Sequence, residues 1–150
     1  TMCWRLGTAM LKAGLRKRCS HCGELIGERK RNEHELACGG ELVPEAHSHY
    51  ARFYLEAKAE ELVKLARAGI AVVPASSLPT RNGKKYEPEG VISEGHVHNR
   101  ALRKMIKLFL AHLWQVWRQA EGLPVPEPYA LAELGHSHYL DPWDFVDREA

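Results

Sequence analysis

The sequence predicts a mainly α-helical fold, or an α+β fold with one short strand or hairpin. Three stretches carry apolar residues at helical spacing, and a stretch rich in proline and glycine separates the last two. A group of cysteine and histidine residues lies within twenty residues near the N-terminus. The 150 residues are 45% hydrophobic and 27% charged, which suits a protein with one sizeable core and excludes the disordered class.

The first expected element is an amphipathic helix that leads into the cysteine group and ends at the basic run 16–18. Its apolar residues recur at helical spacing, namely Trp4, Leu6, Met10, Ala13 and Leu15. Cys3, in the same segment, is the one cysteine outside the group. We expect it to be a small buried side chain.

The cysteine group has the pattern Cys-x2-Cys-x11-His-x3-Cys, formed by Cys19, Cys22, His34 and Cys38. This spacing is typical of a small zinc finger. Two thiolates in a Cys-x2-Cys turn can bind one ion, and a histidine and a cysteine four residues apart lie on one face of a helix. The pattern therefore predicts a short helix over about residues 32–38 and a tetrahedral zinc site.

Four protein ligands make a closed site, which indicates a structural zinc ion and not a catalytic one. Ile26 is expected to plug a small core beside it, and Gly39 and Gly40 to end the helix. His21, between the two cysteines, is not expected to be a ligand because four ligands are already present. The alternative is a set of buried or incidental thiols.

The charge is distributed unevenly along the chain. Residues 1–31 carry eight basic and two acidic side chains, whereas residues 121–150 carry one basic and seven acidic side chains. The basic clusters flanking the first ligand pair are expected to contact phosphate, through Arg16, Lys17, Arg18, Arg29, Lys30 and Arg31. The alternative is an ordinary solvated face. The acidic end either packs on the basic start or mimics nucleic acid and moderates binding.

The middle of the chain predicts a helix over residues 48–68, because apolar residues recur there at helical spacing and Gly69 follows as a stop signal. Residues 70–73 are apolar and β-branched enough for a short strand. Residues 74–95 contain several prolines and glycines, including an Asn-Gly pair. This composition predicts a flexible loop or a loose hairpin.

The strongest helix is expected over residues 100–121, with Asn99 as its cap and a Gly-Leu-Pro stop at 122–124. Its apolar arc is wide, which predicts the central core helix. Its first two turns carry Arg100, Arg103, Lys104 and Lys107. Basic residues at a helix start oppose the macrodipole and suggest a bound anion such as phosphate, although solvated side chains explain them equally well.

Six of the nine histidines form three His-x-His pairs, at 47/49, 96/98 and 136/138. In an extended segment the two residues of a pair face the same way, so two pairs could build a catalytic metal site. His96-Val97-His98 also resembles the His-hydrophobe-His element of nickases and transposases that use a tyrosine nucleophile, for which Tyr139 or Tyr129 would be the candidate. The alternative is that these histidines cap and bridge helix ends.

The residues after this pair carry a family resemblance. The stretch 95–114, followed by Glu-Gly-Leu-Pro-Val-Pro at 121–126 and Leu-Gly-His at 134–136, resembles the C-terminal region of some bacterial insertion-sequence transposases. The resemblance spans about residues 48–140. It implies a nucleic-acid-binding or assembly part of a recombinase, with the catalytic domain upstream of this chain. No catalytic residue is carried over from the family.

These observations divide the chain into a basic helix plus zinc finger (1–46) and a helical domain (47–150) with the loop 74–95, a helix start at Asp141-Pro142 and an acidic end. The predicted function is DNA or RNA binding within a mobile-element protein, with a further domain or a homo-oligomer as the other partners. The alternatives are a metal-dependent nuclease or hydrolase that uses His96, His98 and Tyr139, and a zinc-stabilised protein-interaction module. Reduced cysteines, without an apolar span or a signal peptide, predict the cytoplasm and no membrane partner.

Overall fold

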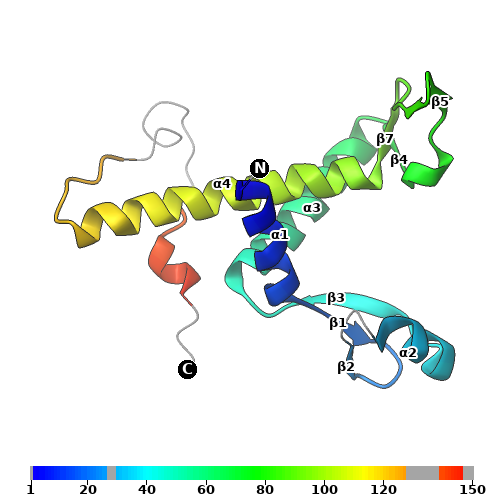
Figure 1. Ribbon diagram of the computed structural model, residues 1–150, viewed down its shortest axis with the longest axis horizontal. Coiled ribbons are helices and arrows are strands. Elements are labelled where there is room, and N and C mark those ends of the chain that lie inside the picture. Colours follow the sequence, from blue (N-terminus) through cyan, green and yellow to red (C-terminus); the bar gives the residue numbers. More distant parts are fainter. Residues whose placement is uncertain (1, 27–29, 128–138, 147–150) are drawn as a thin grey trace.

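The computed structural model describes residues 2–26, 30–127 and 139–146, without the side chains of residues 31, 32, 35 and 36. Three helices form its body: α1 (Met2–Gly14), α3 (His49–Arg67) and α4 (Glu94–Ala120). A small sheet and a short helix project from this body on one side (Figure 1). The prediction of a mainly helical fold with a few short strands is confirmed.

The projecting part consists of β1 (Leu15–Cys19), β2 (Leu25–Ile26), α2 (Arg31–Cys38) and β3 (Leu42–Ala46). β1 is the central strand and pairs antiparallel with both β2 and β3. The sequence analysis did not predict β1 and β3. Their pairing begins where α1 ends, with Leu15 opposite Ala46, and runs outward to Cys19 opposite Leu42. The two strands thus form an arm that carries β2 and α2 away from the helices (Figure 1).

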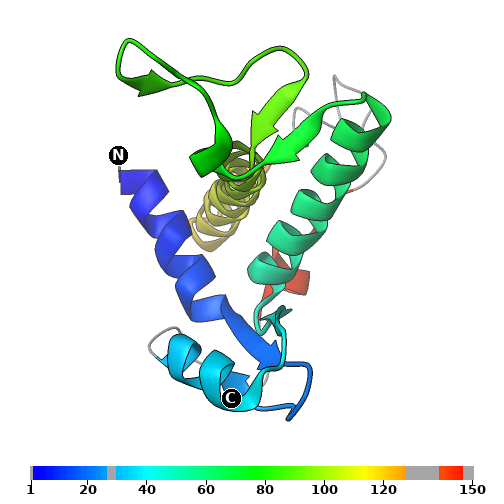
Figure 2. The ribbon, with the colours of Figure 1, turned by 90° about the vertical axis from the view of Figure 1, so that its right-hand side faces the viewer.

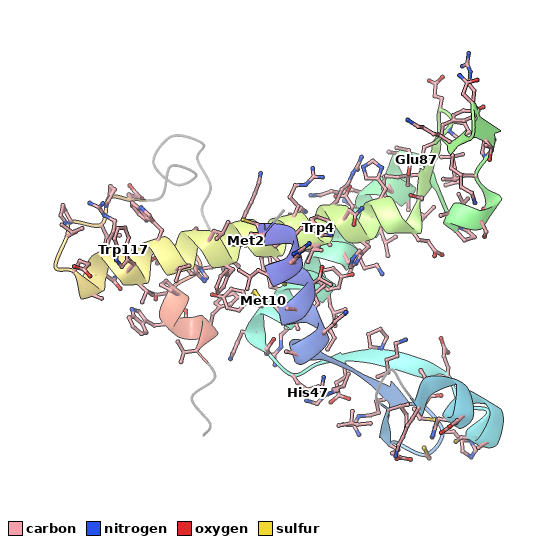
Figure 3. The ribbon with its side chains drawn as sticks, viewed as in Figure 1. Met2, Trp4, Met10, His47, Glu87 and Trp117 are labelled. Carbon is pink, nitrogen blue, oxygen red and sulfur yellow. The ribbon has the colours of Figure 1, made fainter. Side chains whose placement is uncertain are left out.

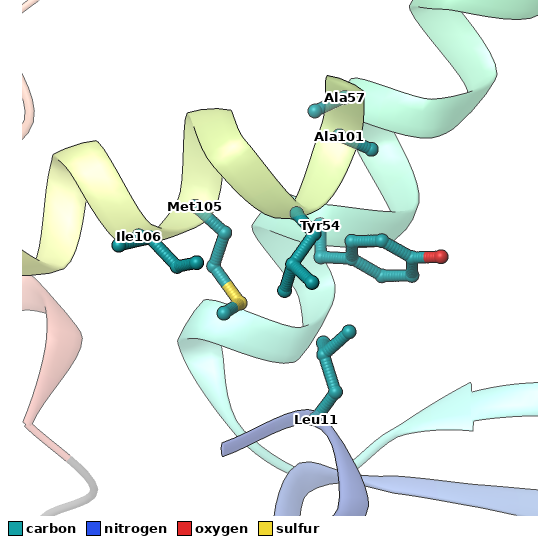
Figure 4. Close-up of a cluster of buried hydrophobic side chains, with 7 residues drawn as sticks. Leu11, Tyr54, Ala57, Ala101, Met105 and Ile106 are labelled. Carbon is teal, nitrogen blue, oxygen red and sulfur yellow. The ribbon is translucent and has the colours of Figure 1, made fainter. Parts of the chain in front are cut away.

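α4 is the longest helix, with α1 on one side of it and α3 on the other (Figure 2). Their shared core is a cluster of buried side chains from all three helices (Figure 4), namely Leu11, Tyr54, Ala57, Ala101, Leu102, Met105 and Ile106. α1 approaches α4 closely at Gly7, where an added Cβ would lie 2.5 Å from Ile106. A glycine is therefore needed at this crossing unless Ile106 moves.

The buried side of α1 differs from the predicted stripe. Trp4 and Leu6 are 36% and 39% exposed, and Cys3 is exposed as well, so all three expectations were wrong. The buried positions are instead Gly7, Leu11 and Gly14. Spacings of four and three residues place them on one helix face. The spacing of hydrophobic residues could not predict this buried face, because two of its three members are glycines.

The predicted helix at 48–68 is confirmed: the Ser48 side chain accepts a hydrogen bond from the Ala51 N–H, and Gly69 follows the helix with a φ of 69°.

The predicted strand at 70–73 is β4 (Ala71–Val73), which pairs in parallel with β7 (Val91–Ser93). Between them lie the 3-10 helix η2 (Ala75–Ser77) and the hairpin of β5 (Thr80–Arg81) and β6 (Lys84–Lys85). Of the two alternatives predicted for residues 74–95, a flexible loop or a loose hairpin, the structure has the hairpin, together with η2 and β7.

α4 begins six residues earlier than predicted. Its cap is Ser93, whose Oγ accepts a hydrogen bond from the His96 N–H, and Asn99 lies inside the helix. The basic residues at 100–107 therefore occupy later turns, so the argument that they oppose the helix dipole no longer applies. The C-terminal end of the helix agrees with the prediction, because Gly122 follows it with a φ of 65°.

Only part of the predicted apolar arc of α4 is in the core. The buried apolar residues lie between Val97 and Ile106, whereas the second half buries the polar His112 and Gln115 and exposes Leu110, Leu113, Trp114 and Trp117. Figure 3 shows Trp117 near the end of α4 that is remote from Glu87. The 3-10 helix η3 (Pro142–Phe145) packs on this half, with Asp141 as its cap as predicted.

The predicted division at residue 46 stays a prediction. α1 precedes that boundary, and its Leu11 lies in the same core cluster as Tyr54 and Met105. No helix in the described ranges is long and apolar enough to cross a membrane.

Candidate metal centre

The four predicted ligands come together at the end of the arm. Cys19 is the last residue of β1, and Cys22 lies in the turn that leads to β2. His34 and Cys38 lie one turn apart on α2. One ligand atom from each residue lies within 4.8 Å of all the others. Among the described residues, this is the one group of three or more such side chains that could hold a metal ion.

The distances within the group suit a tetrahedral ion. Metal–thiolate bonds of about 2.3 Å place two sulfurs roughly 3.8 Å apart, and a sulfur and an imidazole nitrogen roughly 3.5 Å apart. The Sγ atoms of Cys19 and Cys38 are 3.7 Å apart, and Cys22 Sγ lies 3.5 Å from His34 Nε2. None of these cysteines is in a disulfide. The spacing prediction of a four-ligand metal group is therefore confirmed.

The local backbone supports thiolates at this point. The turn is closed by hydrogen bonds from Cys19 N to Glu24 O and from Gly23 N to Cys19 O, both 3.0 Å long. Hydrogen bonds from the Cys22 backbone N–H and from the His34 ring lower the pKa of the Cys19 thiol to about 6. Burial raises the pKa of Cys38. A lowered thiol pKa favours the deprotonated form that binds metals.

The sequence analysis missed two residues that lie beside the group. Glu24 Oε2 lies 3.9 Å from His34 Nδ1, on the ring nitrogen that faces away from Cys22. At this distance the carboxylate lies near the nitrogen without a hydrogen bond to it. Gly40 packs so closely that an added Cβ would lie 2.4 Å from Cys19 Sγ. Its sequence signal, a second glycine after the last ligand, was interpreted only as a helix stop.

The remaining expectations about the finger are mostly confirmed. Ile26 is buried, and Gly39 follows α2 with a φ of 65°. His21 is exposed and lies outside the group. Ser20 helps to fix the backbone, because its Oγ accepts a hydrogen bond from the Glu41 N–H.

The basic residues of β1 are largely engaged within the protein. Arg18 forms an ion pair with Glu45 through two nitrogens and also donates a hydrogen bond to Gly23 O. The Glu45 carboxylate raises the pKa of Arg18, and Arg18 lowers the pKa of Glu45. Arg16 donates to the backbone carbonyls of Lys12 and Leu15, and Lys17 is half-buried. Arg18 therefore joins β1 to β3, and its predicted contact with phosphate stays a prediction.

The other predicted phosphate contacts have different surroundings. Lys30 is exposed directly before α2, whereas Arg29 and the Arg31 side chain lie outside the described part of the chain. On α4, Arg100 is paired with Glu61 at 2.6 Å, and Lys104 is half-buried. Arg103 and Lys107 are exposed, one turn apart.

The structure does not assemble the alternative catalytic site from the residues it describes. His96 and His98 lie in the first turns of α4, where residues two apart point in different directions. The His96 ring bonds Glu87 at 2.7 Å, and the His98 ring bonds the Tyr54 hydroxyl at 2.7 Å. Tyr139 instead bonds Gln115. Both histidines thus serve packing and hydrogen bonding.

The other two histidine pairs do not form a metal group with them. His47 lies 3.6 Å from Glu45, and the His49 ring packs against Phe145. Residues 136 and 138, like Tyr129, lie outside the described residues.

No protein-family model matches the sequence, and no curated protein or solved structure matches it. The resemblance to insertion-sequence transposases therefore stays a prediction.

Proposed function

We propose that the metal group holds one structural zinc ion. Three thiolates and one imidazole are ligands that zinc prefers, and four protein ligands leave no open position for a substrate or a water. The metal module, by which we mean β1, β2, α2 and β3, contributes few buried apolar side chains of its own. Ile26 is one of them. A metal would then supply folding free energy that the small core lacks. Free thiolates also require a reducing compartment, so we propose the cytoplasm.

We further propose that the chain binds DNA or RNA. The observation that carries this proposal is the arm, which holds the metal group away from the helical body (Figure 1) and exposes Lys30 directly before α2. A rigid, metal-stabilised hairpin and helix can present cationic side chains to a phosphate backbone at little entropic cost. Arg103 and Lys107 on α4 extend the set of exposed cations.

The experiment is a fluorescence anisotropy titration of the zinc-loaded chain with labelled DNA and RNA duplexes over a range of salt concentrations. Phosphate contacts predict affinity that falls steeply with salt, with a slope that grows by about one for each phosphate neutralised. The variant Cys22→Ala should lose binding, and Cys3→Ala should retain it, because Cys3 lies outside the metal group. Equal affinity at low and high salt would contradict the proposal.

We propose, from the resemblance of residues 48–140, that this nucleic-acid-binding role belongs to a mobile-element recombinase. In that setting the chain would bind or assemble on DNA, and another part of the recombinase would perform the chemistry. Preferential binding to a duplex that carries a transposon end, over a scrambled duplex of equal length, would support this assignment. Equal binding to both would favour a general nucleic-acid-binding role.

A second candidate function is a zinc-stabilised protein-interaction module. The observation that favours it is the exposure of Trp114 (41%) and Trp117 (55%) on α4. Tryptophan is enriched at protein interfaces and depleted on ordinary surfaces. Protein binding through these rings should depend little on salt, which separates this candidate from phosphate binding.

A further inference from the structure

The β5–β6 hairpin carries a second concentration of positive charge, outside the metal module. Its strands pair with Thr80 opposite Lys85 and Arg81 opposite Lys84. Asn82 and Gly83 form the turn, with φ values of 52° and 74°. Two successive residues of positive φ are typical of the tight turn that matches the twist of a hairpin. The hairpin lies at a corner of the molecule far from α2 (Figure 1).

The hairpin itself carries no acidic residue; the next acidic residues in the sequence are Glu87, whose carboxylate bonds Ser93 and His96, and Glu89. Residues 74–86 contain three basic residues and no acidic residue. Every residue from 79 to 86 is exposed. Lys85 has a structural contact, because its Nζ donates a hydrogen bond to Ala75 O at 2.5 Å and so ties the hairpin to η2.

Arg81 and Lys84 differ from Lys85 in this respect. They are direct cross-strand neighbours, so their Cβ atoms lie about 5 Å apart. Like charges in such a position oppose strand pairing. No ion pair or hydrogen bond connects either side chain to another residue in the described part of the chain. Two adjacent cations that pair with no acidic side chain among the described residues are suited to an external anion.

We infer that Arg81 and Lys84 bind the phosphate backbone of a nucleic acid, at a contact separate from the metal module. This inference rests on the proposed nucleic-acid-binding function and adds a second contact to it. An arginine and a lysine whose Cβ atoms lie about 5 Å apart can both reach one phosphate group, or two successive ones. The turn between them is slender, because Asn82 and Gly83 carry small or no side chains.

A membrane surface is a poorer partner for this hairpin. Interfacial binding requires apolar side chains that enter the lipid, in addition to charge. The tip is formed by Thr80, Asn82 and Gly83, and none of these supplies such an anchor. Tyr86, at the base of the hairpin, is 45% exposed and could stack on a base or a sugar.

The test compares two variants that each remove two exposed positive charges. Arg81→Gln/Lys84→Gln changes the hairpin, and Arg52→Gln/Arg67→Gln changes exposed arginines of α3. Both are titrated, zinc-loaded and full length, with labelled DNA and RNA duplexes across salt. The hairpin variant should bind about 5- to 30-fold more weakly, with a salt slope smaller by about one to two. Its unfolding temperature should stay the same or rise, because a like-charge repulsion has been removed.

The outcomes separate this inference from the proposed function. If wild type binds duplex and the hairpin variant binds like the α3 control, the hairpin inference is overturned and the proposed function stands. If wild type binds neither duplex, both fail. Binding of wild type to phosphatidylserine vesicles, lost in the hairpin variant and without duplex binding, would assign the hairpin to a lipid surface and also overturn the inference. The duplex that the wild type binds more tightly, DNA or RNA, would be assigned as the class of ligand.

Discussion

Gly40 follows the last metal ligand by two residues, and its backbone passes the group with no room for a side chain. An added Cβ would lie 2.4 Å from Cys19 Sγ and 2.8 Å from His21 Cβ. Cys19 is held by strand pairing and His21 by its adjacent turn, so neither can yield easily. The positions of the metal ligands thus depend on a residue that is not itself a ligand.

We predict that Gly40→Ala weakens zinc binding by about 10-fold or more, comparable with the loss of a residue that orients a ligand. Competition with a chromophoric chelator measures this affinity. Gly95→Ala is the control: Gly95 lies in α4, and an added Cβ there meets only Ser93 Oγ, at 4.0 Å. It should leave zinc affinity unchanged and stabilise the helix by up to about 1 kcal/mol. Equal zinc affinity in Gly40→Ala and wild type would contradict the close approach.

The four ligands could be predicted from sequence because their geometry is local. A Cys-x2-Cys turn and a helical pair four residues apart fix ligand positions through backbone geometry alone. Arg18 could not be assigned in the same way. Its partner Glu45 is 27 residues away and meets it only because β1 pairs with β3. Nothing in the basic run at 16–18 signals that pairing, so the ion pair of Arg18 with Glu45 could not be predicted from the sequence.

The start of α4 shows why helix boundaries are harder to predict than helices. Asn99 is a good cap by residue type, but the cap is Ser93. Ser93 is fixed by Glu87, whose Oε1 accepts hydrogen bonds from both its N–H (2.8 Å) and its hydroxyl (2.6 Å). These bonds to Ser93, and one from His96, lower the pKa of Glu87 to about 2. The contact depends on the fold of the loop, which the sequence pattern did not reveal.

We therefore predict that Ser93→Ala lowers the free energy of unfolding by about 1–2 kcal/mol, because the helix loses its cap and Glu87 loses a donor. Asn99→Ala, at the position that residue type favours, should cost less than about 0.5 kcal/mol. Chemical denaturation monitored by circular dichroism gives both values. The reverse order of the two effects would show that the helix begins at residue 100.

The second half of α4 was predicted as core because apolar periodicity does not say what a face packs against. Trp117 and Leu113 are 55% and 53% exposed, although they lie eleven residues, about three turns, after the buried Ile106 and Leu102 and so continue the same helix face. The difference lies in the partners: the core cluster that α4 shares with both α1 and α3 involves its residues 101–106. A wide apolar arc thus indicates a helix with contacts, and only tertiary structure shows where they are.

His112 connects the C-terminal segment to the helical body. Its Nε2 donates a hydrogen bond to the carbonyl of Leu140 at 3.0 Å, which leaves Nδ1 of the neutral ring to accept from the Tyr50 hydroxyl at 2.9 Å. The residue is 4% exposed. Burial lowers the pKa of His112, against smaller raising effects of the Leu140 carbonyl and Asp141. The neutral ring is therefore the form that fits the folded state.

Because the pKa of His112 is lower in the folded state, the unfolded chain binds more protons than the folded protein between the folded pKa and the unfolded pKa of about 6.5. We predict that stability falls as the pH drops through about 6.5, until the folded pKa is reached. The metal group also releases its ion in acid, so His112→Gln is the comparison that isolates this residue. That variant should have a smaller loss of unfolding temperature over the same pH range. An NMR titration that places His112 at or above 6.5 would contradict the prediction.

The measurement that tests the account most directly is the zinc content per chain, by elemental analysis of protein purified under reducing conditions. We predict one zinc in wild type and in Cys3→Ala, and substantially less than one in Cys22→Ala, because Cys22 belongs to the metal group and Cys3 does not. Wild-type protein without bound metal, or a Cys22→Ala variant that keeps a full zinc ion, would contradict it.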